Sequence, residues 1–463
     1  MNWKLNERFL IILDTDYSNW VNIVKAMKYN KRPTIHGTLL RGLDLNRYTN
    51  KDIFNEMTDY KNYKFDTLTK DYLLKKDGSL RGNVYLAPID VLVVTNYLCF
   101  KIFELYQDRE NVFYSGNFNN FDMFYKKQYS RFQKDLLSIY SQYDYYMKVD
   151  IKNFYGNISL DSLVARYEET CDLVCFLKQL GLNEFPIFQD CSGLSYIATR
   201  LFLEDVDSEI LSYIRTIVDK PYLIRYSDDL YILFNQSYNL EDMTNEQVQS
   251  NIKKDLDKIL EKYGLKLNEK FSIGGTLHLP EEVITKLYDF YVPDEDFDIL
   301  EKIGGEVEII RNIKKYIYKL SQVKDIEEYN ALLSSCFSYK DNTHNFEKNL
   351  FNEVLYDRRL NFMIQDSDVI NIMMNTNITI NLWLDPVRIT LLILFSRCEQ
   401  LIKKFLHTLY LKLENDIATQ TDVVALLTYI SQRDVTPLTR RKIINKLAFY
   451  DNNLSVFLGR NLS

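Results

Sequence analysis

The chain has 463 residues, of which 46% are hydrophobic and 26% are charged, and its formal net charge is -7. This balance excludes wholesale disorder, and the length predicts two or three domains of about 100–200 residues each. The glycine and proline counts of 14 and 8 disfavour a turn-rich all-β protein and favour long helices.

The first 290 residues predict a mixed α+β domain. Residues 1–70 have a polar, helical character, and residues 72–86 predict a hairpin, because Asp77-Gly78 is a turn signal between two apolar runs. The remaining elements follow from apolar periodicity and turn residues. They are a buried helix at 89–106, a strand at 145–151, a helix at 201–214, a hairpin at 222–234, a helix at 246–263 ended by Gly264, a short strand at 265–270 and a loop at 273–276.

From residue 291 onward the pattern is helical throughout. The segments with helical periodicity are 300–319, 326–337, 346–355, 378–384, 389–413, 423–431 and 437–450. We therefore expect a strand-and-helix domain at 1–290, followed by an all-α, helical-repeat-like domain at 291–463, in a protein that is mostly helical overall.

The cysteines and the apolar segments predict the compartment. Cys171 and Cys175 have a spacing that suits one helix face and not a zinc site, the other cysteines are scattered, and the histidines form no cluster. Met1 to Phe9 carries charges and no small-residue cleavage site, and the most apolar stretch, residues 389–395, is too short to span a bilayer. We expect a cytoplasmic protein with reduced thiols and no membrane partner.

Two separated segments place carboxylates at the ends of apolar strands. Asp150 ends the strand at 145–151, while Asp228 and Asp229 lie at the tip of the hairpin at 222–234. Nucleotidyl transfer uses two divalent metal ions about 3.5–4 Å apart, and Mg²⁺ binds oxygen ligands while it keeps several waters. If the two strands are adjacent, these acids would form a two-metal site.

These segments resemble the motifs of reverse transcriptases. Tyr226-Ser227-Asp228-Asp229 resembles their Tyr-x-Asp-Asp motif, and residues 149–155 (Val-Asp-Ile-Lys-Asn-Phe-Tyr) resemble their first palm motif. The resemblance implies a right-hand polymerase palm and fingers with deoxynucleoside triphosphates (dNTPs) as substrates. It also implies that two Mg²⁺ ions, or Mn²⁺ in their place, are held by Asp150, Ile151, Asp228 and Asp229.

The resemblance further implies roles for basic and aromatic residues. Lys270 resembles the palm lysine that assists the pyrophosphate leaving group, where a cation stabilises the developing charge. Lys76 and Arg81 resemble the fingers residues that hold the triphosphate. Tyr155, with Phe154 beside it, occupies the place of an aromatic steric gate in the dNTP-binding site. Such a ring excludes a 2′-hydroxyl, which favours DNA as the product.

The segment expected to contact the template or primer departs from the usual family pattern. Asp190 and Cys191 stand where glutamine and glycine are usual, and the segment continues through Ser192 and Ser195. A carboxylate repels a nucleic-acid backbone, so ordinary template handling is not expected, and no primer-grip or thumb signature follows Lys270. The negative net charge also predicts that any positive channel is confined.

These departures, together with the helical C-terminal region, resemble the bacterial abortive-infection and defence-associated reverse transcriptases, the unknown-group enzymes. In that group a helical-repeat domain replaces the thumb, homo-oligomers occur, and some members make single-stranded DNA without a template from a protein hydroxyl. The resemblance predicts a magnesium-dependent DNA polymerase in antiviral defence. No ribonuclease motif stands out in the C-terminal region, so no appended nuclease is expected.

Two alternatives stay open on the sequence. One is an RNA-templated reverse transcriptase of the retron or intron-encoded kind, which would carry a non-coding partner RNA. The other is a non-catalytic helical-repeat interaction protein with a degenerate polymerase domain. The presence of Asp150, Asp228, Asp229 and Lys270 argues against the second alternative.

Overall fold

The structure is a computed structural model, and its contacts divide the chain into two compact units. The described residues are 3–27, 35, 45–75, 79–106, 111–114, 118, 125–188, 191–235, 246–269, 271–276, 279, 306–325, 327–328, 331, 365–375, 386–432 and 434–462. Unit 1 comprises Met1–Asn30, Leu40–Leu68 and Ala87–Phe290, and unit 2 comprises Lys31–Leu39, Thr69–Leu86 and Tyr291–Ser463. The expected domain boundary after residue 290 is thus also a unit boundary, whereas the hairpin expected in the first domain belongs to unit 2.

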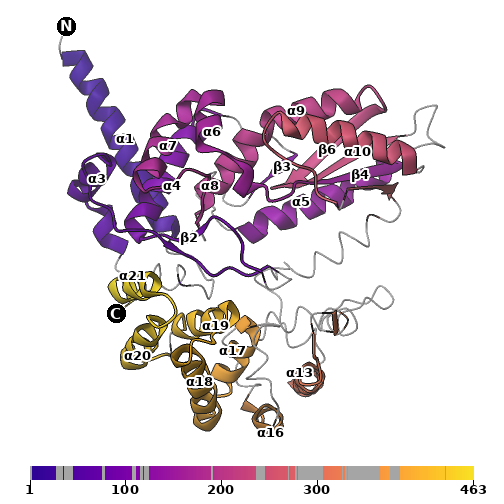
Figure 1. The fold of residues 1–463 in the computed structure, drawn as a ribbon. Helices are drawn as coiled ribbons and strands as arrows, with labels where there is room; N and C mark the ends of the chain where they lie inside the picture. The colour runs from indigo at the N-terminus through magenta and orange to yellow at the C-terminus, as the bar shows by residue number, and fades with distance from the viewer. Residues whose placement is uncertain are drawn as a thin grey trace. The chain divides into compact units, whose positions relative to one another are not determined.

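Unit 1 is built around a five-stranded sheet, whose strands β3, β4 and β6 are labelled in Figure 1. The strand order is β3-β6-β7-β4-β8. The strands are β3 (Val112–Phe113), β4 (Tyr145–Asp150), β6 (Asp219–Tyr226), β7 (Asp229–Asn235) and β8 (Ser272–Gly275). β3 runs parallel to β6, and the other neighbours are antiparallel. Residues 230–234 of β7 are all buried, as expected for a central strand that is covered on both faces.

Helices cover both faces of this sheet. Phe132 of α5 (Tyr125–Ile139) packs in one hydrophobic cluster with Ile224 of β6. The next residue of β6, Arg225, points to the opposite face, because side chains alternate along a strand, and it meets Asp207 of α9 (Leu203–Ile214). Helix α10 (Glu246–Glu261) packs beside α9 (Figure 1).

Helix α4 (Ile89–Phe103) is apolar on nearly all sides and is therefore buried among several other helices of unit 1. Trp20, Phe54 and Tyr97 form an aromatic cluster with ring centroids 5.4–6.0 Å apart. The remaining elements are α1 (Trp3–Met27), η1 (Leu45–Thr49), α3 (Lys51–Thr58), η3 (Tyr140–Gln142), η4 (Tyr155–Asn157), α6 (Leu160–Arg166), η5 (Glu168–Thr170), α7 (Cys171–Gln179), β5 (Ile187–Phe188), α8 (Ser192–Tyr196) and the π-helical η6 (Ile197–Phe202).

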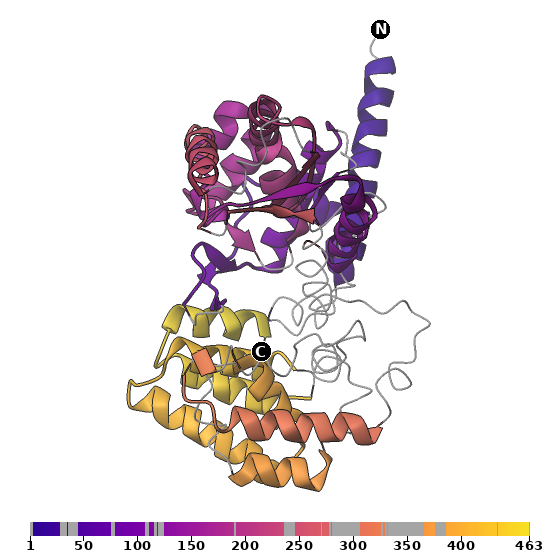
Figure 2. The same cartoon turned by 90° about the vertical axis from the view of Figure 1, so that its right-hand side faces the viewer.

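Unit 2 combines the short hairpin of β1 (Thr69–Lys70) and β2 (Val84–Leu86) with a set of packed helices (Figure 2). The Tyr72 hydroxyl donates to Asp451 at 2.9 Å, which ties the hairpin to the start of the last helix. The helices are α13 (Glu306–Leu320), α16 (Ser367–Asn375), α17 (Pro386–Phe395), α18 (Glu399–Glu414), α19 (Gln420–Ile430), α20 (Pro437–Leu447) and α21 (Asn452–Leu462).

Local sequence signals explain several helix ends. Thr419 and Asp422 form a capping box at the start of α19, and Thr436 caps α20 with Pro437 in its first turn. Gly264 follows α10 with φ of 73°, the left-handed conformation that glycine adopts without steric cost. The observed helices α10, α19 and α20 confirm the helices predicted at 246–263, 423–431 and 437–450.

Three predictions of local structure are wrong. The predicted strand at 265–270 is only a single bridge between Leu267 and Ile151. The predicted loop at 273–276 begins instead as β8, because residues 272–275 pair with the central strand β4. The predicted single helix at 389–413 is two helices, α17 and α18, separated near Arg397, whose φ is 53°. The segments 326–337, 346–355 and 378–384 lie largely or wholly outside the described residues.

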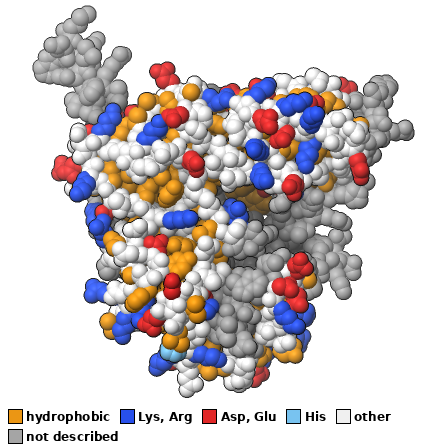
Figure 3. Space-filling view, in the orientation of Figure 1, with side chains coloured by type: hydrophobic (Ala, Val, Ile, Leu, Met, Phe, Trp, Pro, Cys, Tyr) orange, Lys and Arg blue, Asp and Glu red, His pale blue; other side chains and the backbone are white. Residues whose placement is uncertain are grey.

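The surface carries charges of both signs. Lysine and arginine side chains alternate with aspartate and glutamate over the visible face in Figure 3. In the part of the chain that the structure describes, no helix combines the length and the apolar character that a bilayer crossing requires.

Candidate active site

The structure brings the two predicted acidic segments together at one end of the sheet of unit 1. β4 and β7 are antiparallel neighbours, and Asp150 lies directly opposite Asp229. Directly opposed residues on antiparallel strands have Cα atoms about 4.5–5.5 Å apart, and their side chains point to the same face. The carboxylates of Asp150 and Asp229 are therefore neighbours on one face of the sheet.

Asp228 lies in the two-residue turn between β6 and β7. Tyr226 pairs with Asp229 across the hairpin, so Ser227 and Asp228 form the tip. Ser227 has φ of 54°, a left-handed conformation that is uncommon for a residue with a side chain. The turn thus holds Asp228 beside the Asp150–Asp229 pair, on a backbone that needs support from its surroundings.

Three carboxylates at this tip repel one another. Burial, the negative charge of Asp229 and then that of Asp150 raise the pKa of Asp228 to about 6. Asn268 supports the neighbouring strand end: its backbone N–H donates to the Asp150 carbonyl at 2.8 Å, and its side-chain Nδ2 donates to Asp150 Oδ2 at 3.2 Å. A cation bound among these oxygens would offset the repulsion.

The donor chemistry fits a hard divalent cation. Carboxylate oxygens are the ligands that Mg²⁺ prefers, and the backbone carbonyl is the only oxygen that Ile151 can offer. Within the described ranges, no group of three or more His, Cys, Asp and Glu side chains is arranged to hold a metal ion. Mg²⁺ needs fewer protein ligands than that, because it keeps waters and binds substrate phosphates. The structure sets two of the predicted ligands, Asp150 and Asp229, directly opposite each other, and the full set of Asp150, Ile151, Asp228 and Asp229 stays a prediction.

Tyr155 lies beside the hairpin tip. Its hydroxyl is 3.4 Å from Ser227 Oγ and also hydrogen-bonds with Ser195, while its ring stacks on Phe185 with centroids 6.4 Å apart. Burial raises the pKa of this hydroxyl, so it stays protonated. The structure thus brings Tyr155 to the predicted site. Phe154 is only 2% exposed, and its ring packs against that of Tyr155 with centroids 5.0 Å apart.

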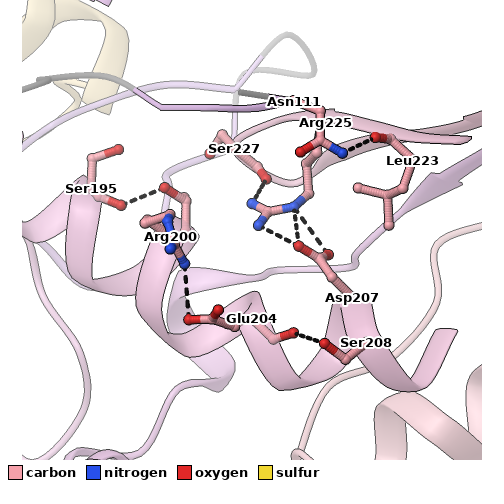
Figure 4. Close-up of polar contacts among 10 residues, drawn as sticks. Asn111, Ser195, Arg200, Glu204, Asp207, Ser208, Leu223, Arg225 and Ser227 are labelled. Carbon is pink, nitrogen blue, oxygen red and sulfur yellow. Dashed lines mark hydrogen bonds and ion pairs between the residues drawn. The ribbon is translucent and has the colours of Figure 1, made fainter. Parts of the chain in front are cut away.

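A buried ion pair lies under the tip (Figure 4). Arg225 Nη2 donates to Asp207 Oδ2 at 2.7 Å, and the two side chains are 1% and 3% exposed. This pair was not predicted from the sequence. Two features of the sequence could have indicated it. An arginine interrupts the apolar run of β6, and Asp207 lies on the same face of α9 as the apolar Ile210.

The structure describes only some of the other predicted site residues. Lys76, Asp190 and Lys270 lie outside the described residues, as does the side chain of Ser192. Ser195 is buried and hydrogen-bonds with the Tyr155 hydroxyl. Arg81 is exposed in unit 2, where its backbone N–H donates to the Leu73 carbonyl at 2.8 Å.

The comparisons with known proteins concern unit 2. Residues 304–458 match the family model for a domain of unknown function, DUF8609, which covers less than half of the chain. No curated protein matches the chain. The match spans α13 to α20 and most of α21, and it includes none of the acidic residues of the candidate active site.

The raised pKa of Asp228 predicts a pH-dependent stability. The folded protein favours the protonated, neutral carboxyl of Asp228. The stabilisation of the fold by this carboxyl is therefore complete below the unfolded pKa of about 3.9 and is lost as the pH rises through about 6. Asparagine stays neutral. The free energy of unfolding of Asp228→Asn relative to the unchanged protein should therefore increase by about 1–2 kcal/mol from pH 5 to pH 7.5.

Denaturant titrations in EDTA at the two pH values measure this difference. A difference that stays constant between pH 5 and pH 7.5 would contradict the assignment of buried, mutually repelling carboxylates. The exposed Asp219→Asn, at the other end of β6, is the control and should show no such trend.

Proposed function

We propose that the chain is a DNA polymerase of the reverse-transcriptase type that transfers nucleotides from dNTPs by two-metal chemistry. The observation that supports it most is the register of β4 against β7, which sets Asp150 opposite Asp229 beside the Asp228 turn. Two sequence motifs far apart in the chain, each resembling a reverse-transcriptase motif, meet at one strand end. In this proposal unit 1 contains the palm.

The reaction joins a 3′-hydroxyl, or an initiating tyrosine hydroxyl, to the α-phosphate of a dNTP. The hydroxyl oxygen forms the new phosphoester bond and loses its proton, and pyrophosphate leaves. Two bound Mg²⁺ ions would supply charge stabilisation at the attacking and leaving oxygens. Asp150 and Asp228 would hold them, with Asp229 and the Ile151 carbonyl nearby.

The other residues of the chain would position the nucleotide. The Tyr155 ring, fixed by its contacts with Ser227 and Phe185, would pack under the sugar and exclude a 2′-hydroxyl. Lys270 would act as a point charge that assists the pyrophosphate leaving group, as the resemblance implies.

The setting of this activity is part of the proposal. We place the protein in the bacterial cytoplasm, acting in anti-phage defence as a homo-oligomer whose helical unit 2 replaces a thumb. The cysteines that the structure describes, Cys99, Cys171, Cys175, Cys191 and Cys398, form no disulfide with one another, which agrees with a reducing compartment. The product would be single-stranded DNA, made with or without a template.

Incubation of the purified protein with labelled dNTPs and Mg²⁺ tests the proposal. We expect a DNase-sensitive product that disappears with EDTA, and sequencing of the product separates copied from random synthesis. Discrimination against ribonucleotides should weaken in Tyr155→Ala. A co-purifying RNA of reproducible sequence would instead support the RNA-templated alternative. A chain that binds no nucleotide and makes no DNA would refute the polymerase and revive the non-catalytic alternative.

A further inference from the structure

Each polar group of Ser227, in the backbone and in the side chain, has a hydrogen-bond partner. Its N–H donates to the Phe113 carbonyl of β3 at 2.9 Å. Its carbonyl accepts from Arg225 Nη1 at 2.8 Å, and its hydroxyl lies 3.4 Å from the Tyr155 hydroxyl. These three contacts come from different elements and explain how a non-glycine residue keeps φ of 54°.

Arg225 connects this strained residue to the helix layer (Figure 4). Its Nε and Nη2 atoms donate to the Asp207 carboxylate at 3.1 and 2.7 Å, which leaves Nη1 for the Ser227 carbonyl. The Arg225 backbone N–H also donates to the Asn111 carbonyl at 3.0 Å. A guanidinium carries its donors on three nitrogen atoms in a fixed plane, so it reaches the carboxylate and the carbonyl on two sides, whereas the donors of a lysine all radiate from one nitrogen.

A buried ion pair is weak evidence for stability, because desolvation of both charges offsets their attraction. The hydrogen bond from Arg225 to the strained Ser227 points to a role in positioning the turn and not in stability. We propose that Arg225 and Asp207 are positioning residues, which fix the Ser227 backbone and thereby the place of the Asp228 carboxylate. This inference rests on the proposed function for its effect on catalysis, but the restraint on the turn does not depend on that function.

The central test replaces the ion pair with apolar residues of similar size. Arg225→Met combined with Asp207→Leu removes both buried charges together, a change that folded proteins tolerate much better than the loss of one partner. The double variant keeps the packing between β6 and α9 but lacks the donor to the Ser227 carbonyl. Arg225→Lys is the conservative variant. It keeps the positive charge but lacks the planar guanidinium, so its hydrogen exchange and kcat should still differ from those of the unchanged protein.

Two measurements are made on the full chain. Amide hydrogen exchange in peptides that cover residues 223–232 should be about tenfold faster in the double variant, while exchange in residues 145–149 of β4 stays unchanged. In dNTP incorporation, kcat should fall by about tenfold or more while KM for dNTP changes by less than about twofold, because the interaction acts on the reacting geometry and not on nucleotide binding.

Glu204→Gln is the matched control. It breaks the Arg200–Glu204 ion pair on the same helical layer, one turn before Asp207, without touching Ser227 (Figure 4). It should leave exchange at residues 223–232 and kcat unchanged. If the double variant does not fold, Arg225→Lys is compared with Glu204→Gln by the same two measurements.

The outcomes separate this inference from the proposed function. Unchanged exchange at the turn overturns the inference, and so does faster exchange with an unchanged kcat. Faster exchange together with a lower kcat supports it. If the unchanged protein makes no DNA, the proposed function fails, and the exchange measurement alone then decides whether Arg225 and Asp207 restrain the turn.

Discussion

Replacement of Asp228 by asparagine is expected to lower dNTP incorporation by about 10³-fold or more while the chain stays folded. The amide has nearly the shape of the carboxylate but lacks the charge that would hold a divalent cation. The substitution also removes one of three mutually repelling carboxylates, whose repulsion contributes to the raised pKa of Asp228. A folded but inactive variant would therefore assign the loss to chemistry and not to instability. Asp150→Asn should behave in the same way.

Asp219→Asn is the matched control for this prediction. Asp219 lies on β6 as well, but at the opposite end from the Asp228 turn, where it is exposed and lies opposite Asn235. Incorporation by this variant should equal that of the unchanged protein. Incorporation by Asp228→Asn within about twofold of the unchanged protein would contradict the assignment of metal ligands.

The meeting of the acidic segments was predictable from the sequence because each signal is local. An apolar run ending at Asp150 and a turn-forming Ser-Asp pair between two apolar runs predict a strand and a hairpin. The register was not predictable. A slip of one residue between β4 and β7 would turn Asp150 to the other face of the sheet, and only the packing of both faces sets that register.

β8 shows why long-range strand pairing is hard to predict from the sequence. Ile273-Gly274-Gly275 has poor intrinsic strand propensity and looks like a loop. In the structure Gly274 lies opposite Tyr146, whose ring atoms would be 3.1–3.2 Å from a β-carbon at this glycine. The absence of a side chain at Gly274 thus permits the close approach of Tyr146. This role of the glycine becomes visible only when the two strands lie side by side.

The buried ion pair was missed for a related reason. Hydrophobic patterning treats a charged residue inside an apolar strand as a break in the pattern, whereas Arg225 is accommodated because Asp207 faces it from another element. The burial of Phe154 was not predicted either, because its position in the motif pointed to the dNTP-binding site and not to the core.

Loss of one partner of the Arg225–Asp207 pair should destabilise the fold much more than loss of one partner of an exposed ion pair. Asp207→Ala leaves the Arg225 guanidinium buried without its carboxylate, which should lower the free energy of unfolding by about 3–5 kcal/mol. Asp161→Ala is the comparison, because it breaks the ion pair with Lys178, whose side chains are 43% and 82% exposed, and should change the stability by less than about 1 kcal/mol. Urea denaturation followed by circular dichroism measures both. Equal effects of the two substitutions would show that the Arg225 charge reaches solvent, and it could not then restrain the turn from inside the fold.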